Sequence, residues 1–299
     1  MLSHRFFKAH YGHVCCGVIA ILGIAAATSL NLASAPAKAD VRALSAHSYA
    51  WHSKPFTLTL EAGVKPPAGF QRLPAEPDSF AAWLRGLPLK PIGSPVLLYT
   101  GARKWRQDVH VAVIDIDVGK RDLQQCADAV MRLRSEWLWG TGRSSKIAFN
   151  YTGGGRVPFS RWAKGDRPSE NGRHWRRRGK RDGSYKSLRR YMIQVFAYAG
   201  TYSLSHELKK VSLDDMRIGD VFIKGGFPGH AVLVADMVQN PDTGEKRFLL
   251  LQSFMPAQDM HILKNPDDPS GSPWYVADFS WPLQTPEWRF EKGSLKRWP

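Results

Sequence analysis

The chain has 299 residues, 43% of them apolar, and carries a formal net charge of +16. This apolar fraction is ordinary for a globular protein and supplies a sizeable core for one large domain or two small ones. After an N-terminal apolar run there is no second long apolar segment, so the sequence argues against a mature protein that spans a membrane.

The first 39 residues have the order of a secretory signal peptide. Arg5 and Lys8 make a basic start, an apolar run covers about residues 14–27, and Ala37 and Ala39 form a small-residue cleavage motif. The apolar run is shorter than the ~20 residues of a membrane span, although an uncleaved anchor is the alternative interpretation. We therefore expect cleavage near Ala39 and a periplasmic or secreted mature protein.

Cleavage leaves Cys126 as the only cysteine of the mature chain, because Cys15 and Cys16 lie in the signal peptide. Exported proteins normally use cysteines in disulfide pairs, so an odd cysteine indicates an intermolecular bond or a free reactive thiol. A thiol redox protein is the weaker interpretation, since the mature chain has no resolving cysteine. The downstream residues described below favour a nucleophilic thiol.

The segment 40–75 is mixed in composition and contains prolines, which predicts a loosely packed lead-in to one domain over residues 76–299. Apolar positions spaced three and four apart after a Ser/Asp start predict a short capped helix over residues 78–85. Residues 96–99 and 110–116 read as strands. Because acidic and apolar residues alternate there, Asp115 and Asp117 are expected to face solvent.

The next helix is predicted over residues 122–139, with Asp122 as its N-cap and glycines after its end. Cys126 would lie near the start of this helix, where unpaired backbone N–H groups carry partial positive charge and favour the thiolate. The apolar face of the helix comprises Leu123, Cys126, Ala127, Val130, Leu133 and Trp137. That face also fits the alternative that Cys126 is a buried, inert core residue.

A strongly basic stretch follows at residues 156–190, with ten arginines, three lysines and three acidic residues, a net charge of about +10. Such a run binds nucleic acid, membrane phosphates or an anionic polymer, or it is a solvated, mobile loop. Export argues against nucleic acid. We expect a basic loop that keeps the domain near anionic envelope polymers.

The last part of the chain predicts a helix over residues 191–208 and then an antiparallel meander, with strands at 220–223, 230–235 and 247–252. A cysteine-bearing helix packed on an antiparallel sheet makes the fold class α+β. If the last two strands pair, His230 at the start of one lies beside Gln252 at the end of the other.

These residues supply the parts of a catalytic triad. Cys126 would be the nucleophile, His230 the base, and the Gln252 carbonyl would accept a hydrogen bond from the imidazole and orient it. Alternatively, His230 and Gln252 are ordinary residues at the edge of the sheet. The histidines lack the close pairs of a zinc site, and the glycines at 153–155 lack the Lys and Ser/Thr of a phosphate loop. The sequence therefore predicts no metal and no cofactor.

The order of motifs resembles that of the papain-like cell-wall cysteine peptidases and amidases. The shared features are a cysteine-bearing helix, the Gly-Asp strand at residues 219–223, the Gly-His strand at 229–234, and a polar residue on the following strand. The resemblance covers about residues 122–253 and implies a papain-like fold with Cys126, His230 and Gln252 as catalytic residues. The residues flanking Cys126 differ from those of the common murein endopeptidases.

Longer matching stretches at residues 118–134, 225–231 and 252–258 resemble the bacterial domain-of-unknown-function family 4846. This second resemblance extends from about Phe80 to the C-terminus and implies a recurrent domain without supplying an activity. Together the two resemblances imply a bacterial cysteine hydrolase that cleaves an amide or isopeptide bond in an envelope polymer, most plausibly in peptidoglycan stem peptides. The alternative is a non-catalytic envelope-binding module that uses the basic stretch and its tryptophans.

Overall fold

The computed structural model describes residues 49–53 and 55–299. The expected signal peptide lies outside the described residues, as does the first part of the expected lead-in. Among the described helices, none has the length and the apolar character needed to cross a bilayer.

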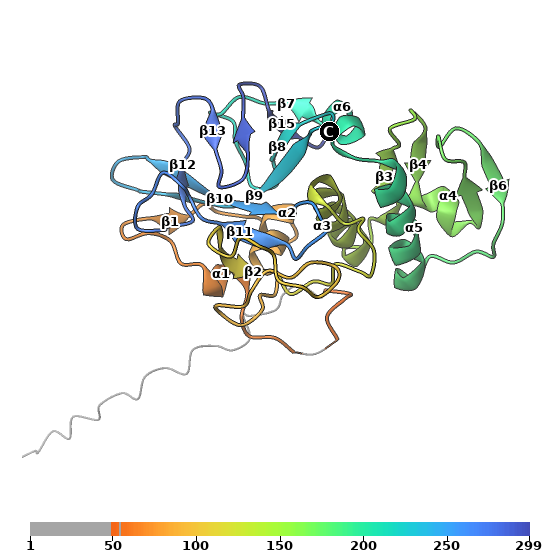
Figure 1. Ribbon diagram of the computed structural model, residues 1–299, viewed down its shortest axis with the longest axis horizontal. Coiled ribbons are helices and arrows are strands. Elements are labelled where there is room, and N and C mark those ends of the chain that lie inside the picture. Colours follow the sequence, from red (N-terminus) through yellow and green to blue (C-terminus); the bar gives the residue numbers. More distant parts are fainter. Residues whose placement is uncertain (1–48, 54) are drawn as a thin grey trace, which may run out of the picture. The chain divides into compact units, whose positions relative to one another are not determined.

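The fold is α+β and is built around an antiparallel sheet (Figure 1). Its neighbouring strands run in the order β2–β11–β10–β9–β8–β15–β7, while β1 pairs with β9 and β12 with β10. The bounds of these strands are β1 (Gln71–Arg72), β2 (His110–Val113), β7 (Lys209–Lys210), β8 (Val221–Lys224), β9 (His230–Gln239), β10 (Lys246–Gln252), β11 (His261–Leu263), β12 (Tyr275–Val276) and β15 (Leu295–Arg297). The predicted meander is therefore present as β8, β9 and β10.

Apolar side chains cover both faces of the central strand β9. Leu233 points into a large cluster shared with helices α2 (Phe80–Arg85) and α3 (Cys126–Gly140). Val232 and Val234 point into a second cluster, which includes residues of the hairpin β13 (Leu283–Gln284) and β14 (Arg289–Phe290). Because both faces are buried, residues 231–235 of β9 form a continuous apolar run, and His230 lies at the start of this central strand.

The expected lead-in is partly folded onto the domain. Helix α1 (Leu60–Gly63) is capped by Thr59, whose side chain accepts a hydrogen bond from the backbone of Ala62, and β1 pairs with the end of β9. Tyr49 is buried and donates its hydroxyl to the backbone carbonyl of Trp83 at 2.7 Å. These contacts use side chains that compositional reasoning about a Pro-bearing segment does not detect.

The expected helix over residues 191–208 is two helices, α5 (Tyr185–Tyr198) and α6 (Thr201–Glu207). Ala199, after the end of α5, and Gly200, before the start of α6, both have extended backbone and separate the two helices. The predicted strand at residues 96–99 is reduced to isolated bridges, such as Leu98 with Gln258.

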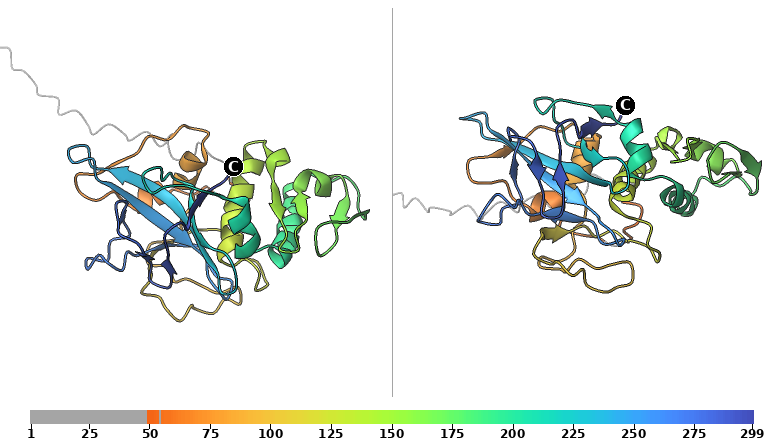
Figure 2. Two further views of the ribbon diagram at one scale, coloured as in Figure 1. Left: turned by 90° about the horizontal axis from the view of Figure 1, so that it is seen from above. Right: turned by 45° about the horizontal axis from the view of Figure 1, so that its top comes forward.

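The prediction of a basic loop over residues 156–190 was wrong, because this stretch folds. Its elements, together with those just before it, are the 3₁₀ helix η2 (Ser144–Lys146), β3 (Ala148–Asn150), β4 (Arg156–Pro158), α4 (Phe159–Ala163), β5 (Asp166–Pro168) and β6 (Trp175–Arg177). Phe159 and Trp162 of α4 are buried in the large cluster and anchor the stretch to the core. The prediction considered only the charge of the stretch and did not take these two aromatic residues into account. We call residues 156–190 the basic lobe; it lies on the far side of α3 from the sheet (Figures 1 and 2).

Candidate active site

Helix α3 begins at Cys126, four residues later than predicted. Asp122 does not cap it, because its carboxylate accepts hydrogen bonds from the backbone of Ala257 at 2.6 Å and from the side chain of Gln125 at 3.0 Å. The cap is instead Gln125, whose backbone N–H donates to the carboxylate of Asp128 at 3.1 Å. Cys126 is thus the first residue of the helix, where the backbone N–H groups point toward its thiol.

The thiol of Cys126 is nevertheless held in its neutral form. Only 6% of the residue is exposed, and this burial raises the thiol pKa to about 11, with a further rise from the negative charge of Asp128. The backbone N–H groups of Ala231, Ala127 and Cys126 act in the opposite direction but do not outweigh burial. The helix terminus therefore lowers the thiol pKa as expected, but desolvation raises the same pKa by a larger amount.

His230 is the first residue of β9 and follows a tight glycine-rich loop at residues 225–229. At Gly229 a Cβ atom would lie 2.3 Å from the side-chain oxygen of Thr201, so only glycine lets the chain enter the strand at this point. The imidazole packs against the rings of Phe254 and Trp288, with centroids 4.8 and 5.2 Å away. Burial lowers the His230 pKa to about 4, so the ring is neutral at physiological pH.

Gln252, the last residue of β10, lies 3.0 Å from His230, measured from its Oε1 to the imidazole Nε2. Its Nε2 donates to Glu287 Oε2 at 2.8 Å and lies 3.2 Å from Nε2 of His261. An ionised carboxylate only accepts hydrogen bonds, so Glu287 fixes which end of the Gln252 amide carries the hydrogens. His230 must then donate from Nε2, which leaves the lone pair on Nδ1.

Two further residues complete this polar group, and sequence reasoning missed both. Glu287 lies between β13 and β14, and its Oε1 accepts from Lys104 Nζ at 2.7 Å. The two side chains are only 7% and 2% exposed, so the ion pair is buried. Lys104 is 183 residues from Glu287 along the chain, and no local pattern links them.

The structure joins His230 to Gln252 but does not join the thiol to the imidazole. Cys126 contacts the backbone of Ala231, the residue after His230, and no hydrogen bond between Cys126 and His230 occurs in the described part of the chain. The Cys126 thiol therefore lies beside the residue that follows His230, and the thiol and the imidazole are both neutral at physiological pH. In unliganded enzymes catalytic hydrogen bonds are often long and tighten only when substrate binds.

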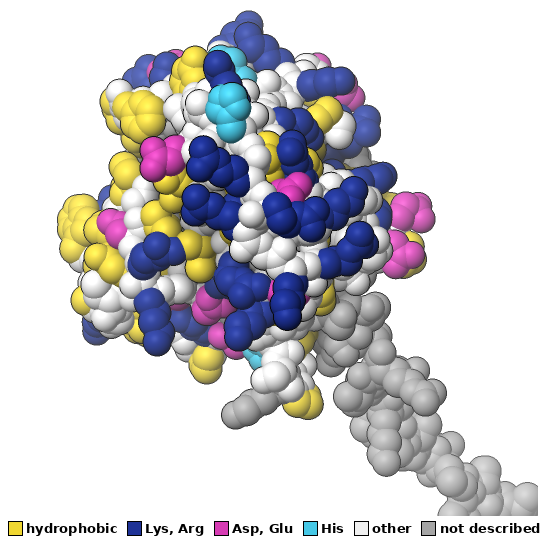
Figure 3. Space-filling view, turned by 90° about the vertical axis from the view of Figure 1, so that its right-hand side faces the viewer, with side chains coloured by type: hydrophobic (Ala, Val, Ile, Leu, Met, Phe, Trp, Pro, Cys, Tyr) yellow, Lys and Arg dark blue, Asp and Glu magenta, His cyan; other side chains and the backbone are white. Residues whose placement is uncertain are grey.

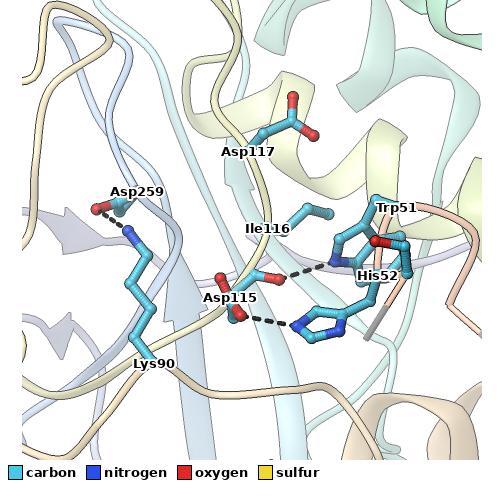
Figure 4. A pocket seen from close by; sticks show the side chains of 8 residues that line it. Trp51, His52, Lys90, Asp115, Ile116, Asp117 and Asp259 are labelled. Atoms are coloured by element: carbon cyan, nitrogen blue, oxygen red, sulfur yellow. Dashed lines mark hydrogen bonds and ion pairs between the residues drawn. The ribbon is translucent and has the colours of Figure 1, made fainter. Parts of the chain in front are cut away.

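A cavity of about 430 Å³ lies elsewhere, and Asp115 and Asp117 line it (Figure 4). Each side chain is about half exposed, as the expectation of a solvent-facing position requires, yet each is also paired. Asp115 accepts from His52 at 2.8 Å, and Asp117 accepts from Arg132 at 2.9 Å. Lys90 pairs with Asp259 in the same cavity. These ion pairs account for the carboxylates, and we place none of them in the candidate active site.

The raised pKa of Cys126 leads to a first prediction. Alkylation by iodoacetamide should be slow at neutral pH and rise about tenfold per pH unit between about pH 7 and 10, because only the thiolate reacts. Burial raises the pKa of the Asp128 carboxyl well above its ordinary value. Asp128→Asn keeps an acceptor for the Gln125 N–H, so it should speed alkylation only at pH values at which the wild-type carboxyl is ionised and repels the thiolate. A plateau below about pH 9 in the unliganded wild type would contradict the neutral thiol.

Comparison with known protein families identifies the family of this chain. The family model described as domain of unknown function (4846) matches residues 60–297, a span that includes all the residues of the candidate site. No curated protein and no solved structure matches the chain.

Proposed function

The chain belongs to the domain-of-unknown-function family 4846, and we propose that it is an exported cysteine hydrolase with a papain-like arrangement of its catalytic residues. The observation that carries the proposal is a hydrogen-bond series in which His230 donates to Gln252 and Gln252 donates to Glu287, while Lys104 donates to the same carboxylate. This series holds a neutral imidazole in one orientation with its Nδ1 lone pair available, which is what a general base requires. A histidine that served only packing would not need a buried ion pair to orient it.

In the proposed reaction, Cys126 Sγ attacks the carbonyl carbon of an amide bond while its proton passes to Nδ1 of His230. The tetrahedral intermediate places its oxyanion near the backbone N–H of Cys126, which has no partner within the helix. The C–N bond then breaks, the leaving amine takes the proton from His230, and an acyl-enzyme remains. Water, deprotonated by His230, attacks the thioester and releases the acid and the thiol.

The neutral resting state is compatible with this sequence. With a thiol pKa of about 11 and an imidazole pKa of about 4, proton transfer is unfavourable until a bound substrate changes the surroundings of both groups. We expect substrate to bring Nδ1 and Sγ into contact and to stabilise the charge that develops. The buried thiol is then protected from oxidation and alkylation until substrate is present.

We propose an amide or isopeptide bond in peptidoglycan stem peptides as the target. The support is the expected signal peptide together with a basic lobe that suits an anionic envelope polymer. Incubation of the mature chain with purified peptidoglycan, followed by mass spectrometry, should reveal products that gain the mass of water at one amide bond. If neither whole sacculi nor isolated stem peptides are cleaved, peptidoglycan is excluded as the substrate.

The second candidate is a non-catalytic envelope-binding module, favoured by the buried thiol and its lack of a hydrogen bond to His230. In that case Cys126 is a core residue and binding resides in the basic lobe. Peptidoglycan binding that persists in Cys126→Ala, without turnover in the wild type, would support this second function.

A further inference from the structure

The basic lobe contains a hairpin in which arginines on one face are paired with a carboxylate, whereas those on the other face are not. Strands β5 and β6 pair with Asp166 opposite Arg177 and Arg167 opposite Arg176. On the first face the carboxylate of Asp166 accepts from Arg177 at 2.9 Å and from Arg161 at 3.3 Å, so both of its oxygens are used. On the second face two like charges lie directly opposite each other, an arrangement that destabilises a strand pair.

This second face has no matching carboxylate. Arg178 lies just beyond the end of β6 and lines the same cavity as Arg167 and Arg176. In the described part of the chain, no ion pair involves Arg167, Arg176 or Arg178, and Asp182 is paired with Arg190 at 2.7 Å. The three guanidinium groups thus form a cationic cluster that the lobe itself does not neutralise.

All three arginines line one cavity of about 460 Å³. Ser169, His174 and Gln194 add polar groups to its lining, and Glu170 adds the single carboxylate, which opposes an anion. Figure 3 shows Lys and Arg side chains crowded over this end of the molecule. The side chains that line the cavity are therefore mostly polar, and their positive charges outnumber the negative one.

The cluster is built on a rigid support. Arg167 stacks its guanidinium 3.8 Å from the ring centroid of the buried Trp162 and donates from one nitrogen to the backbone oxygens of Trp162 and Asp166. The hairpin is closed onto Gly165, whose φ is +103° and whose Cβ would lie 2.1 Å from the backbone oxygen of Gly179. The guanidinium of Arg167 is consequently held in place, and the backbone of the hairpin brings Arg176 and Arg178 to the same cavity.

We propose that this cavity is a binding site for phosphate groups. A carboxylate has two oxygens and satisfies one guanidinium fork, whereas a phosphate offers three or four oxygens and up to two charges to several arginines at once. The source is either a phosphate-bearing polymer or a phospholipid headgroup, and the chemistry recognised is the same. This inference is independent of the proposed hydrolase activity, since it involves neither Cys126 nor His230.

The test uses inorganic pyrophosphate and isothermal titration calorimetry on the mature chain. The variant Arg176→Gln/Arg178→Gln, with Arg167→Gln added as a third change, should bind pyrophosphate at least about tenfold more weakly than the wild type. The matched control is Lys164→Gln/Lys180→Gln/Lys186→Gln, which removes the same charge from exposed lysines of the lobe that do not line the cavity. The control should bind within about threefold of the wild type.

Equal losses in the two triple variants would overturn the site and leave only general electrostatic attraction. Failure of the wild type to bind pyrophosphate at low salt, or equal affinity for citrate, would also overturn the assignment. If Arg167→Gln unfolds the lobe, the double variant decides the matter, because Arg176 and Arg178 are exposed. Competition against pyrophosphate in the calorimeter then distinguishes the source. Displacement by polyphosphate alone points to a phosphate-bearing polymer, and displacement by phosphatidylglycerol vesicles alone points to a phospholipid headgroup.

Discussion

Replacing Cys126 by serine should lower turnover by about 10⁴-fold or more while the domain stays folded. The hydroxyl of serine has a far higher pKa than a thiol, and nothing in this site compensates for the difference. His230 is buried and neutral with a pKa of about 4, so it is too weak a base to activate an alcohol. The measurement is release of product from peptidoglycan stem peptides, with the melting temperature of each variant as the check on folding.

Cys126→Ala is the matched control for this result. It removes the nucleophile without placing a hydroxyl in a site that is 6% exposed, so the two variants separate loss of chemistry from loss of stability. Both should be inactive, and the alanine variant should melt at least as high as the serine variant. Turnover within about tenfold of wild type in either folded variant would exclude Cys126 as the nucleophile and leave the binding module.

The parts of the site that sequence reasoning predicted are those linked by local geometry. Strands β9 and β10 form a hairpin, so the pairing that places His230 beside Gln252 spans only 22 residues, and its consequence is the 3.0 Å contact. The Gly-His pair at residues 229–230 is visible in the sequence, and the structure explains the glycine by the nearness of Thr201. Alternation along a strand and turn composition are sufficient for such inferences.

The parts that were missed depend on packing between distant segments. Glu287 is 35 residues beyond Gln252, and Lys104 reaches the same carboxylate from a loop before β2. No periodicity marks an acid or a lysine that will be buried as a pair. Desolvation of Cys126 is likewise a property of the assembled core, which is why a thiolate was expected from the helix start and a neutral thiol was found.

The fold of the basic lobe also depends on packing that the sequence pattern did not reveal. Charge density predicted a solvated loop, but Trp162 and Phe159 anchor the segment in the core and the arginines occupy its surface. The net charge of a segment indicates its solubility and the kind of partner it attracts, but it does not predict whether the segment folds. Here the burial of two aromatic residues anchors the folded segment.

The second large effect is expected at Glu287. Glu287→Gln leaves the Lys104 cation buried without a counter-charge, since the two side chains are only 2% and 7% exposed, and should cost about 3–5 kcal/mol of unfolding free energy. Adding Lys104→Met removes the unpaired cation, and urea denaturation should show at least half of the lost stability restored. A cost below about 1 kcal/mol for the single variant would contradict the buried ion pair.

Stability alone does not reveal whether Glu287 positions the base, but a pair of double variants does. With Lys104→Met in both, Glu287→Gln still offers an oxygen to the Gln252 amide, while Glu287→Leu offers none. The first double variant should keep kcat within about tenfold of wild type, and the second should lose about 100-fold, with KM little changed in either. Equal kcat values in the two would show that Glu287 only holds the fold together. A difference between them would mean that the orientation of the Gln252 amide, and through it the Nδ1 lone pair of His230, sets the rate.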